Sequence, residues 1–225
     1  SIVLPNQLFE KSPLFSNEST IYLVEESLFF NQYTFHKQKL FFHRFSMKKY
    51  EYFLMDKGLD VHYIDAIEKH SDLRILIENI SNKYNAIQII DPNDFLVEKR
   101  LRRVSNKFNL KLIIHENPMF LCKKDDLDFF KPEKKKFFQT SFYKSQREKF
   151  NILIDISGGP EGGSWTYDTM NREKYPPNKK PPEIICINNK TQLFSDTYNY
   201  INNNYNKNYG TLESEFFYPT DFEQS

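Results

Sequence analysis

Cysteine, glycine and tryptophan are scarce in this sequence of 225 residues, and these shortages exclude several classes of structure. Two distant cysteines, Cys122 and Cys186, cannot build a disulfide framework or, by themselves, a four-thiolate metal site. The histidines show no metal-ligand spacing either, so no metal site is expected. No apolar run approaches the roughly 18 residues of a membrane span. The few cysteines fit a reducing compartment, and we expect a cytoplasmic protein (nuclear in a eukaryotic or viral setting) that is not secreted.

Charge of one sign is also missing. Lys and Arg together number 31 and Asp and Glu 30, which leaves a net charge of +1. This balance excludes a wholly basic coat for nucleic acid but leaves room for local basic faces. Aromatic residues are plentiful, with 22 Phe and 14 Tyr, so rings can supply much of a globular core.

Short apolar runs alternate with helical patterns through the first half of the chain. The runs that we predict to be strands are residues 1–4, 20–24, 61–64, 86–90 and 110–114. This alternation predicts an α/β fold: a doubly wound, Rossmann-like, five-stranded parallel sheet in the order 3-2-1-4-5. Gly58 is expected to end the helix over residues 37–57. We assign residues 1–156 to this domain, and 157–225 to a glycine-rich loop and a linker extension, with an Asn-rich helix over 191–205.

A ligand pocket is expected where the strand order reverses, because open α/β sheets bind ligands beyond the carboxyl ends of the strands at that point. The turns there are residues 5–7 and 91–93. They lack the G-x-G-x-x-G motif, which argues against a dinucleotide of the NAD type. The amides of Asn6 and Gln7 either line a pocket or brace the loop. His36, at a helix start, either donates a hydrogen bond into the pocket or is structural.

Residues 134–149 predict a basic helix with Lys144 and Arg147 interleaved with aromatic side chains. Such a face either contacts phosphates or is simply solvated. The following loop, residues 157–172, holds four of the six glycines and the single tryptophan, Trp165. We expect Arg172 to lock this loop through a carboxylate such as Asp168. The loop is then either pinned on its own domain or part of an interdomain surface.

Several motifs together resemble the photolyase-related branch of the photolyase/cryptochrome family, the group of iron–sulfur bacterial cryptochromes and (6-4) photolyases. The most specific is residues 162–172, GGSWTYDTMNR, which matches the family pattern G-G-x-W-N-[FY]-D-x-x-N-R. Weaker matches are 5–8 (PNQL), 35–39 (FHKQK), 119–122 (MFLC), 134–147 and 209–212 (YGTL). The resemblance covers only the amino-terminal half of such proteins.

The resemblance implies an antenna-type domain, in which a lumazine-type ring lies near Asn6, Gln7, Glu25 and His36. Where the family has Asp, this chain has Asn6, which removes a charge-assisted acceptor for the ring or its ribityl chain. FAD and a [4Fe–4S] cluster are expected only in a carboxy-terminal helical half outside this chain. Lys144, Arg147, Trp165, Tyr167, Asp168 and Arg172 are expected to contact DNA or that helical half.

The function expected from the resemblance is a part in light-driven repair of UV-damaged DNA, of the (6-4) type, by a flavoprotein. This chain alone is then inactive. Its expected partners are the helical half, damaged DNA for the complete protein, and a second copy of itself, but no membrane. Two alternatives remain: a cryptochrome-like photoreceptor domain, and a stand-alone module that binds nucleotides or nucleic acid.

Overall fold

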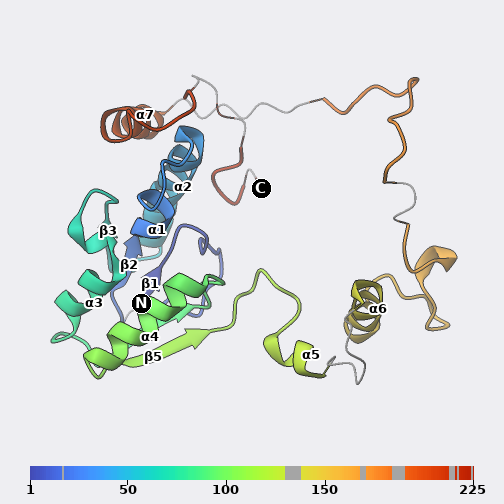
Figure 1. Ribbon diagram of the computed structural model, residues 1–225, viewed down its shortest axis with the longest axis horizontal. Coiled ribbons are helices and arrows are strands. Elements are labelled where there is room, and N and C mark those ends of the chain that lie inside the picture. The colour runs from blue at the N-terminus through green and yellow to red at the C-terminus, as the bar shows by residue number, and fades with distance from the viewer. Residues whose placement is uncertain are drawn as a thin grey trace. The chain divides into compact units, whose positions relative to one another are not determined.

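Parallel strands alternate with helices through the first 115 residues of the computed structural model (Figure 1). The structure describes residues 1–16, 18–129, 138–167, 171–183, 191–212, 216, 218–223 and 225. The strands are β1 (Ile2–Val3), β2 (Ile21–Val24), β3 (Val61–Ile64), β4 (Ala86–Ile90) and β5 (Lys111–His115). The helices are α1 (Ser27–Phe30), α2 (Lys37–Asp56), α3 (Leu73–Ile80), α4 (Phe95–Lys107), α5 (Lys124–Phe129), α6 (Gln139–Phe150) and α7 (Gln192–Asn204), with short 3₁₀ helices at Lys69–Ser71 and Glu161–Gly163.

The strands form two parallel ladders, and this corrects the expected single sheet of five strands. One ladder has the order β1-β2-β3 and the other joins β4 to β5. β1 and β4 contact each other, but no backbone ladder links these two described strands. The reason lies in the shortness of β1: the chain turns directly after it, with the Gln7 amide donating to the Leu4 carbonyl at 2.9 Å. Pro5, within that turn, has no N–H to offer a neighbouring strand.

Helices cover both faces of the strands, as an α/β fold requires. Val3 and Leu23 join a core with α2 and α7, in which phenylalanine rings predominate. The alternate residues Ile2 and Val24 join a second core with α3 and α4. Successive side chains of a strand point to opposite faces, so the continuous apolar runs of β1 and β2 supply both cores.

The ends of α2 are fixed by its flanking residues. At the start, His36 Nδ1 accepts a hydrogen bond from the Gln38 amide at 3.1 Å. At the end, Gly58 has φ of +73°, and its amide donates to the Met55 carbonyl at 2.8 Å. The expectation that Gly58 ends this helix is confirmed, because a left-handed residue after the last turn favours glycine.

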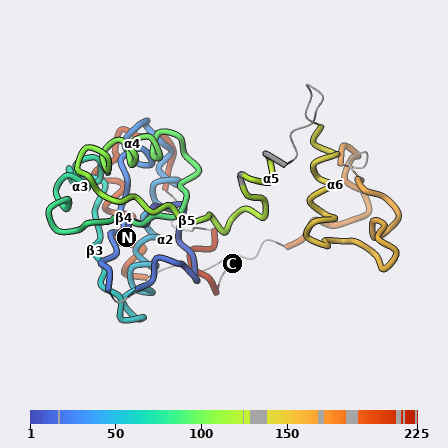
Figure 2. The backbone as a smooth tube through the Cα atoms, turned by 90° about the horizontal axis from the view of Figure 1, so that it is seen from below, coloured from blue at the N-terminus to red at the C-terminus, as the bar shows by residue number. Residues whose placement is uncertain are grey.

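The chain divides into two compact units, and the division differs from the boundary that we placed after residue 156. Unit 1 contains Ser1–Asn117 and Ile184–Ser225, and unit 2 is Pro118–Glu183. The carboxy-terminal chain belongs to unit 1 because α7 packs against α2 (Figure 2). Residues that follow α7 in the chain also bond unit 1. The Lys37 amide donates to the Tyr209 carbonyl at 3.0 Å, and the Asn208 side chain donates to the Phe35 carbonyl at 2.8 Å. The expected linker extension is therefore largely part of the α/β unit.

Unit 2 has a different internal organisation. Its described part consists of α5, α6 and the glycine-rich loop, and Arg147 is its one buried side chain among the described residues. The basic helix that we expected from residue 134 begins at Gln139, and residues 130–137 lie outside the described residues.

Candidate functional site

The two turns expected to flank a pocket are joined directly. The Gln7 side-chain amide donates to the Ile90 carbonyl at 2.7 Å and to the Asp91 carbonyl at 3.3 Å. The Asn6 amide donates to the Pro92 carbonyl at 3.3 Å. These bonds connect the carboxyl ends of β1 and β4, where no backbone ladder does so.

The same two amides each leave one oxygen without a partner among the described residues. Asn6 Oδ1 and Gln7 Oε1 are both buried, and Gln7 as a whole is only 1% exposed. A buried polar atom without a hydrogen bond destabilises a protein by about 1–3 kcal/mol. This edge of unit 1 therefore presents two acceptors that an N–H or O–H donor would satisfy.

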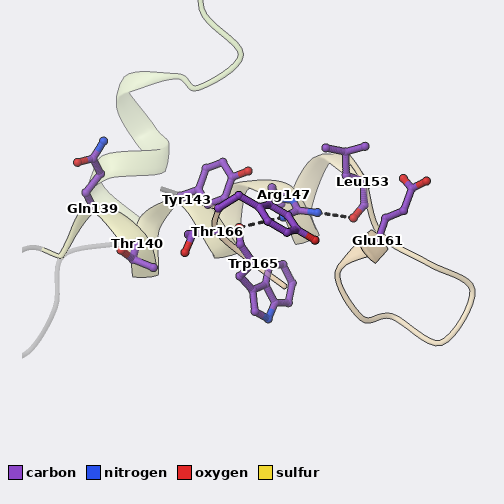
Figure 3. A pocket seen from close by; sticks show the side chains of 9 residues that line it. Gln139, Thr140, Tyr143, Arg147, Leu153, Glu161, Trp165 and Thr166 are labelled. Atoms are coloured by element: carbon purple, nitrogen blue, oxygen red, sulfur yellow. Dashed lines mark hydrogen bonds between the residues drawn. The ribbon is translucent and has the colours of Figure 1, made fainter. Parts of the chain in front are cut away.

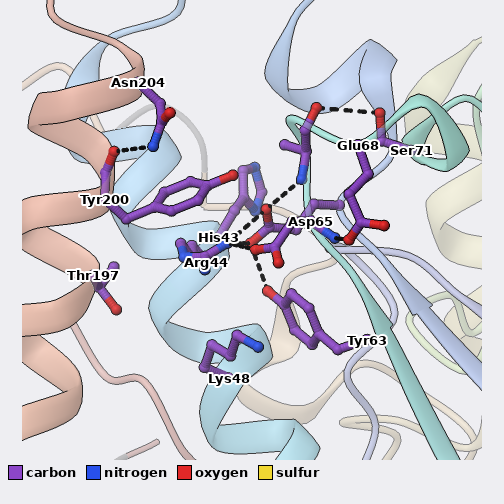
Figure 4. Close-up of polar contacts among 12 residues, drawn as sticks. His43, Arg44, Lys48, Tyr63, Asp65, Glu68, Ser71, Thr197, Tyr200 and Asn204 are labelled. Atoms are coloured by element: carbon purple, nitrogen blue, oxygen red, sulfur yellow. Dashed lines mark hydrogen bonds and ion pairs between the residues drawn. The ribbon is translucent and has the colours of Figure 1, made fainter.

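Glu25, at the end of β2, is fully buried and its carboxylate is already occupied. It accepts bonds from Arg44 Nη1 at 2.8 and 2.9 Å, from the Tyr63 hydroxyl at 2.5 Å and from the Ala66 amide at 2.8 Å. Burial raises the pKa of the Glu25 carboxyl above its usual value, although Arg44 opposes this. In Figure 4, Tyr63 and Asp65 lie near Arg44, which also donates to the Asp65 carboxylate. Glu25 thus fastens β2, β3 and α2 together.

Glu26 is a second buried carboxylate that sequence reasoning missed. Its Oε1 accepts from Arg100 at 3.0 Å, and its Oε2 accepts from the Leu28 amide at 2.5 Å and so caps α1. Burial raises the pKa of this carboxyl also. Adjacent acids directly after a buried strand were the available signal, because alternation sends their side chains to opposite faces.

His36 has a structural position. Its Nδ1 caps α2, and its ring packs edge-on against Tyr209 with 5.1 Å between centroids. A Cβ on Gly210 would lie 2.1 Å from His36 Nε2, so the backbone there approaches the ring closely. Of the four expected antenna residues, Asn6 and Gln7 each keep an oxygen without a partner among the described residues, whereas the Glu25 carboxylate and His36 Nδ1 already have partners.

The glycine-rich loop of unit 2 is fastened by Arg147, which is 6% exposed. Its guanidinium donates to the carbonyls of Ile152 at 3.1 Å, Trp165 at 3.2 Å and Leu153. We expected Arg172 to lock the loop through Asp168. Arg172 is exposed and Asp168 lies outside the described residues, so the lock that the structure shows is Arg147.

A pocket of about 350 Å³ opens between α6 and this loop (Figure 3). We call it the loop pocket; it is lined by Gln139, Thr140, Tyr143, Arg147, Leu153, Glu161, Trp165, Thr166 and Tyr167. The Trp165 ring lies under two cations, with Arg147 5.1 Å and Lys144 5.4 Å from its centroid. Tyr167 is exposed and donates to the Gly162 carbonyl at 2.9 Å. The structure thus brings Lys144, Arg147, Trp165 and Tyr167 to one place.

Two further classes of site are absent from the described part of the chain. It contains no group of three or more His, Cys, Asp or Glu side chains arranged to hold a metal ion. Within the same residues, no helix combines the length and apolar character that crossing a bilayer demands.

Comparison with known proteins places these features in context. The family model described as deoxyribodipyrimidine photo-lyase-related protein matches residues 1–217, which span both units. The chain is also similar to Uncharacterized protein R852 of Acanthamoeba polyphaga mimivirus, with 38% identity over 189 residues. That alignment covers 78% of this chain and 94% of the viral protein.

Proposed function

We propose, from the premise that this chain belongs to the deoxyribodipyrimidine photo-lyase-related protein family, that it is the antenna-type part of a light-driven system repairing UV-damaged DNA of the (6-4) type. In this proposal the chain binds a light-absorbing ring. The flavin chemistry belongs to a helical partner that holds FAD and a [4Fe–4S] cluster, so this chain alone has no repair activity.

The observation that carries the proposal is the pair of buried acceptors at the ends of β1 and β4. Asn6 Oδ1 and Gln7 Oε1 lack partners among the described residues, and they lie where α/β folds bind ligands. A lumazine-type ring or its ribityl chain carries the N–H and O–H donors that such oxygens accept. The bound ring would absorb light and pass the energy to the flavin.

The four residues suggested by the family do not contribute equally. Asn6 and Gln7 fit the ring, since each has an acceptor to spare. Glu25 accepts four bonds within the protein, and His36 caps a helix, so we assign them to the support of the edge.

Titration of the purified protein with a ribityl-lumazine and with riboflavin, followed by ligand fluorescence anisotropy, tests the proposal. Asn6→Ala should weaken binding about three- to tenfold, as loss of one neutral hydrogen bond does. Asn6→Asp, which loses the bond to Pro92 but offers a carboxylate, should bind more tightly than Asn6→Ala. The control is Asn82→Ala, an exposed asparagine in the turn that precedes β4. Equal affinity in all four proteins would refute an antenna site at this edge.

A stand-alone module that binds nucleic acid is the second candidate, and the loop pocket favours it. Co-expression with a helical half from a photolyase-related protein separates the two functions. Capture of the folded half on this chain supports the antenna role, whereas nucleic-acid binding without capture supports the module.

A further inference from the structure

Several aromatic rings in the described part of unit 2 are exposed. Tyr143, Tyr167 and Tyr175 are 42%, 55% and 57% exposed, and Arg147 is the one buried side chain in the described part of the unit. Rings on a rigid support offer flat apolar faces to a ligand. Arg147 provides that support, since it ties α6 to the carbonyls of Ile152 and Leu153, just after the helix, and to the carbonyl of Trp165 in the loop.

The loop pocket combines stacking faces with polar groups at its ends. In Figure 3, Tyr143, Arg147 and Trp165 lie in the middle, between Gln139 on one side and Glu161 on the other. The amide of Gln139 can both donate and accept hydrogen bonds, and the Glu161 carboxylate accepts from N–H groups. A planar heterocycle with N–H groups on its edge matches this distribution.

The size of the pocket and the charge beside it restrict the class of ligand further. Pockets for small molecules range over about 300–1,000 Å³. At about 350 Å³ the loop pocket suits one ring system. Lys144 is half-buried, with its ammonium 5.4 Å from the Trp165 ring centroid, so a cation stands next to the stacking surface. A base that stacks while its phosphate meets a lysine is the usual way in which proteins hold single-stranded nucleic acid.

We propose that the loop pocket binds one unpaired nucleobase of a single-stranded nucleic acid, with the exposed ring of Tyr143 as the stacking surface, Trp165 beside it and Lys144 as the phosphate contact. Gln139, one helical turn before Tyr143, meets the edge of the base. Arg147 is a positioning residue, because its guanidinium is committed to loop carbonyls. This binding does not depend on the antenna site, which belongs to the other unit.

Trp165 is the single tryptophan of the chain, so its fluorescence reports binding at this pocket alone. The intact protein is titrated with a short single-stranded oligonucleotide, with the abasic form of the same strand, and with the duplex. We expect saturable quenching by the single strand, and none by the abasic strand, which has phosphates but no bases to stack. The duplex should bind at least tenfold more weakly, because its bases are paired.

Variants are compared by anisotropy of a labelled single strand. Tyr143→Ala should weaken binding about tenfold, in line with the loss of one stacking ring. Lys144→Gln should lower the slope of log affinity against log salt by about one. The control is Tyr33→Ala, a tyrosine of unit 1 that is 66% exposed, and it should bind as the unaltered protein does.

Three results would overturn the proposal: absence of binding, equal binding of the abasic strand, or unaltered affinity of Tyr143→Ala. The lumazine titration on the same variants keeps this test separate from the proposed function. Tyr143→Ala should leave lumazine binding intact, and Asn6→Ala should leave oligonucleotide binding intact.

Discussion

Replacing Arg147 by methionine should unfold the glycine-rich loop while leaving unit 1 intact. Methionine keeps an unbranched apolar stem but removes every donor. The carbonyls of Ile152, Leu153 and Trp165 then lose their common partner. Among the described residues of unit 2, no side chain belongs to either hydrophobic core, so the effect should remain local.

The size of the effect follows from these bonds. A hydrogen bond to a charged group contributes about 1.5–3 kcal/mol, so three bonds give an upper sum near 9 kcal/mol. Ile152 and Leu153 are exposed, so water replaces much of what their carbonyls lose. Leu153 also relaxes from a left-handed backbone, with φ of +53°, which offsets about 1–2 kcal/mol. We expect a net loss of about 3 kcal/mol in local stability.

Native-state hydrogen exchange measures this loss directly. The Glu161 amide donates to the Leu153 carbonyl at 2.9 Å, and its exchange should accelerate by about a hundredfold in Arg147→Met. In Arg147→Lys the Glu161 amide should exchange at a rate between those of the unaltered protein and Arg147→Met, because one ammonium cannot reach three carbonyls. Arg102→Met, which removes an exposed pair with Glu98 on α4, is the control and should change little. Unaltered exchange at Glu161 would show that Arg147 does not hold the loop.

Three other predictions concern single side chains. His43 packs against Phe29 and Phe30, and burial, helped by Lys39, lowers its pKa to about 4. The unfolded chain therefore takes up this proton first as the pH falls, and up to about 3 kcal/mol of stability should be lost between pH 6.5 and 4. Denaturant melts at several pH values should show a smaller loss in His43→Phe. An equal dependence of unfolding free energy on pH in both proteins would contradict the lowered pKa of His43. Arg44→Met should destabilise unit 1 by about 3–5 kcal/mol in such melts, because it leaves the Glu25 carboxylate buried without its cation. A loss below about 1 kcal/mol would contradict the buried pair. Leu153→Gly should stabilise the loop by about 1 kcal/mol, seen as slower exchange at Glu161, because the side chain is 57% exposed and its backbone left-handed. Faster exchange would contradict this.

Strand positions could be predicted from the sequence because each strand is a short, mostly apolar run closed by polar or turn residues. The runs at 61–64 and 86–90 match β3 and β4 at both ends, and the other three differ by only one or two residues at their ends. The joining of strands into one sheet could not be predicted. It depends on how far β1 extends before its turn, and the run at 1–4 yields a strand of two residues.

The path of the carboxy-terminal chain also depends on contacts that no local pattern encodes. The Asn-rich helix over 191–205 is confirmed as α7. Its packing against α2 rests on Phe194 meeting Phe41, whose ring centroids lie 4.9 Å apart. Proline and lysine before this helix are typical of a linker, so the sequence suggested that the chain was leaving the domain.

At the candidate sites, the sequence predicted which side chains would be involved better than it predicted the groups that they bond. Residues 6 and 7 lie at the strand ends, as expected, because turn positions follow from strand positions. Arg44 was missed because it lies within an aromatic helical stripe, and only the fold sets it beside Glu25. Arg147 was not predicted to hold the glycine-rich loop, because the Trp165 carbonyl that it bonds lies 18 residues further along the chain.

The internal organisation of unit 2 has a consequence for how binding would be detected. The loop is held by one buried arginine, and the rings around it are exposed. It therefore has little apolar burial of its own, and its local stability is low. A ligand that binds only the folded loop stabilises it by RT ln(1 + [L]/Kd), about 2.7 kcal/mol at a hundredfold excess over Kd. The antenna edge rests between two hydrophobic cores and has less to gain. Nucleic acid should therefore slow exchange at Glu161 far more than at Ile89 in β4, and the reverse order would place the ligand on unit 1.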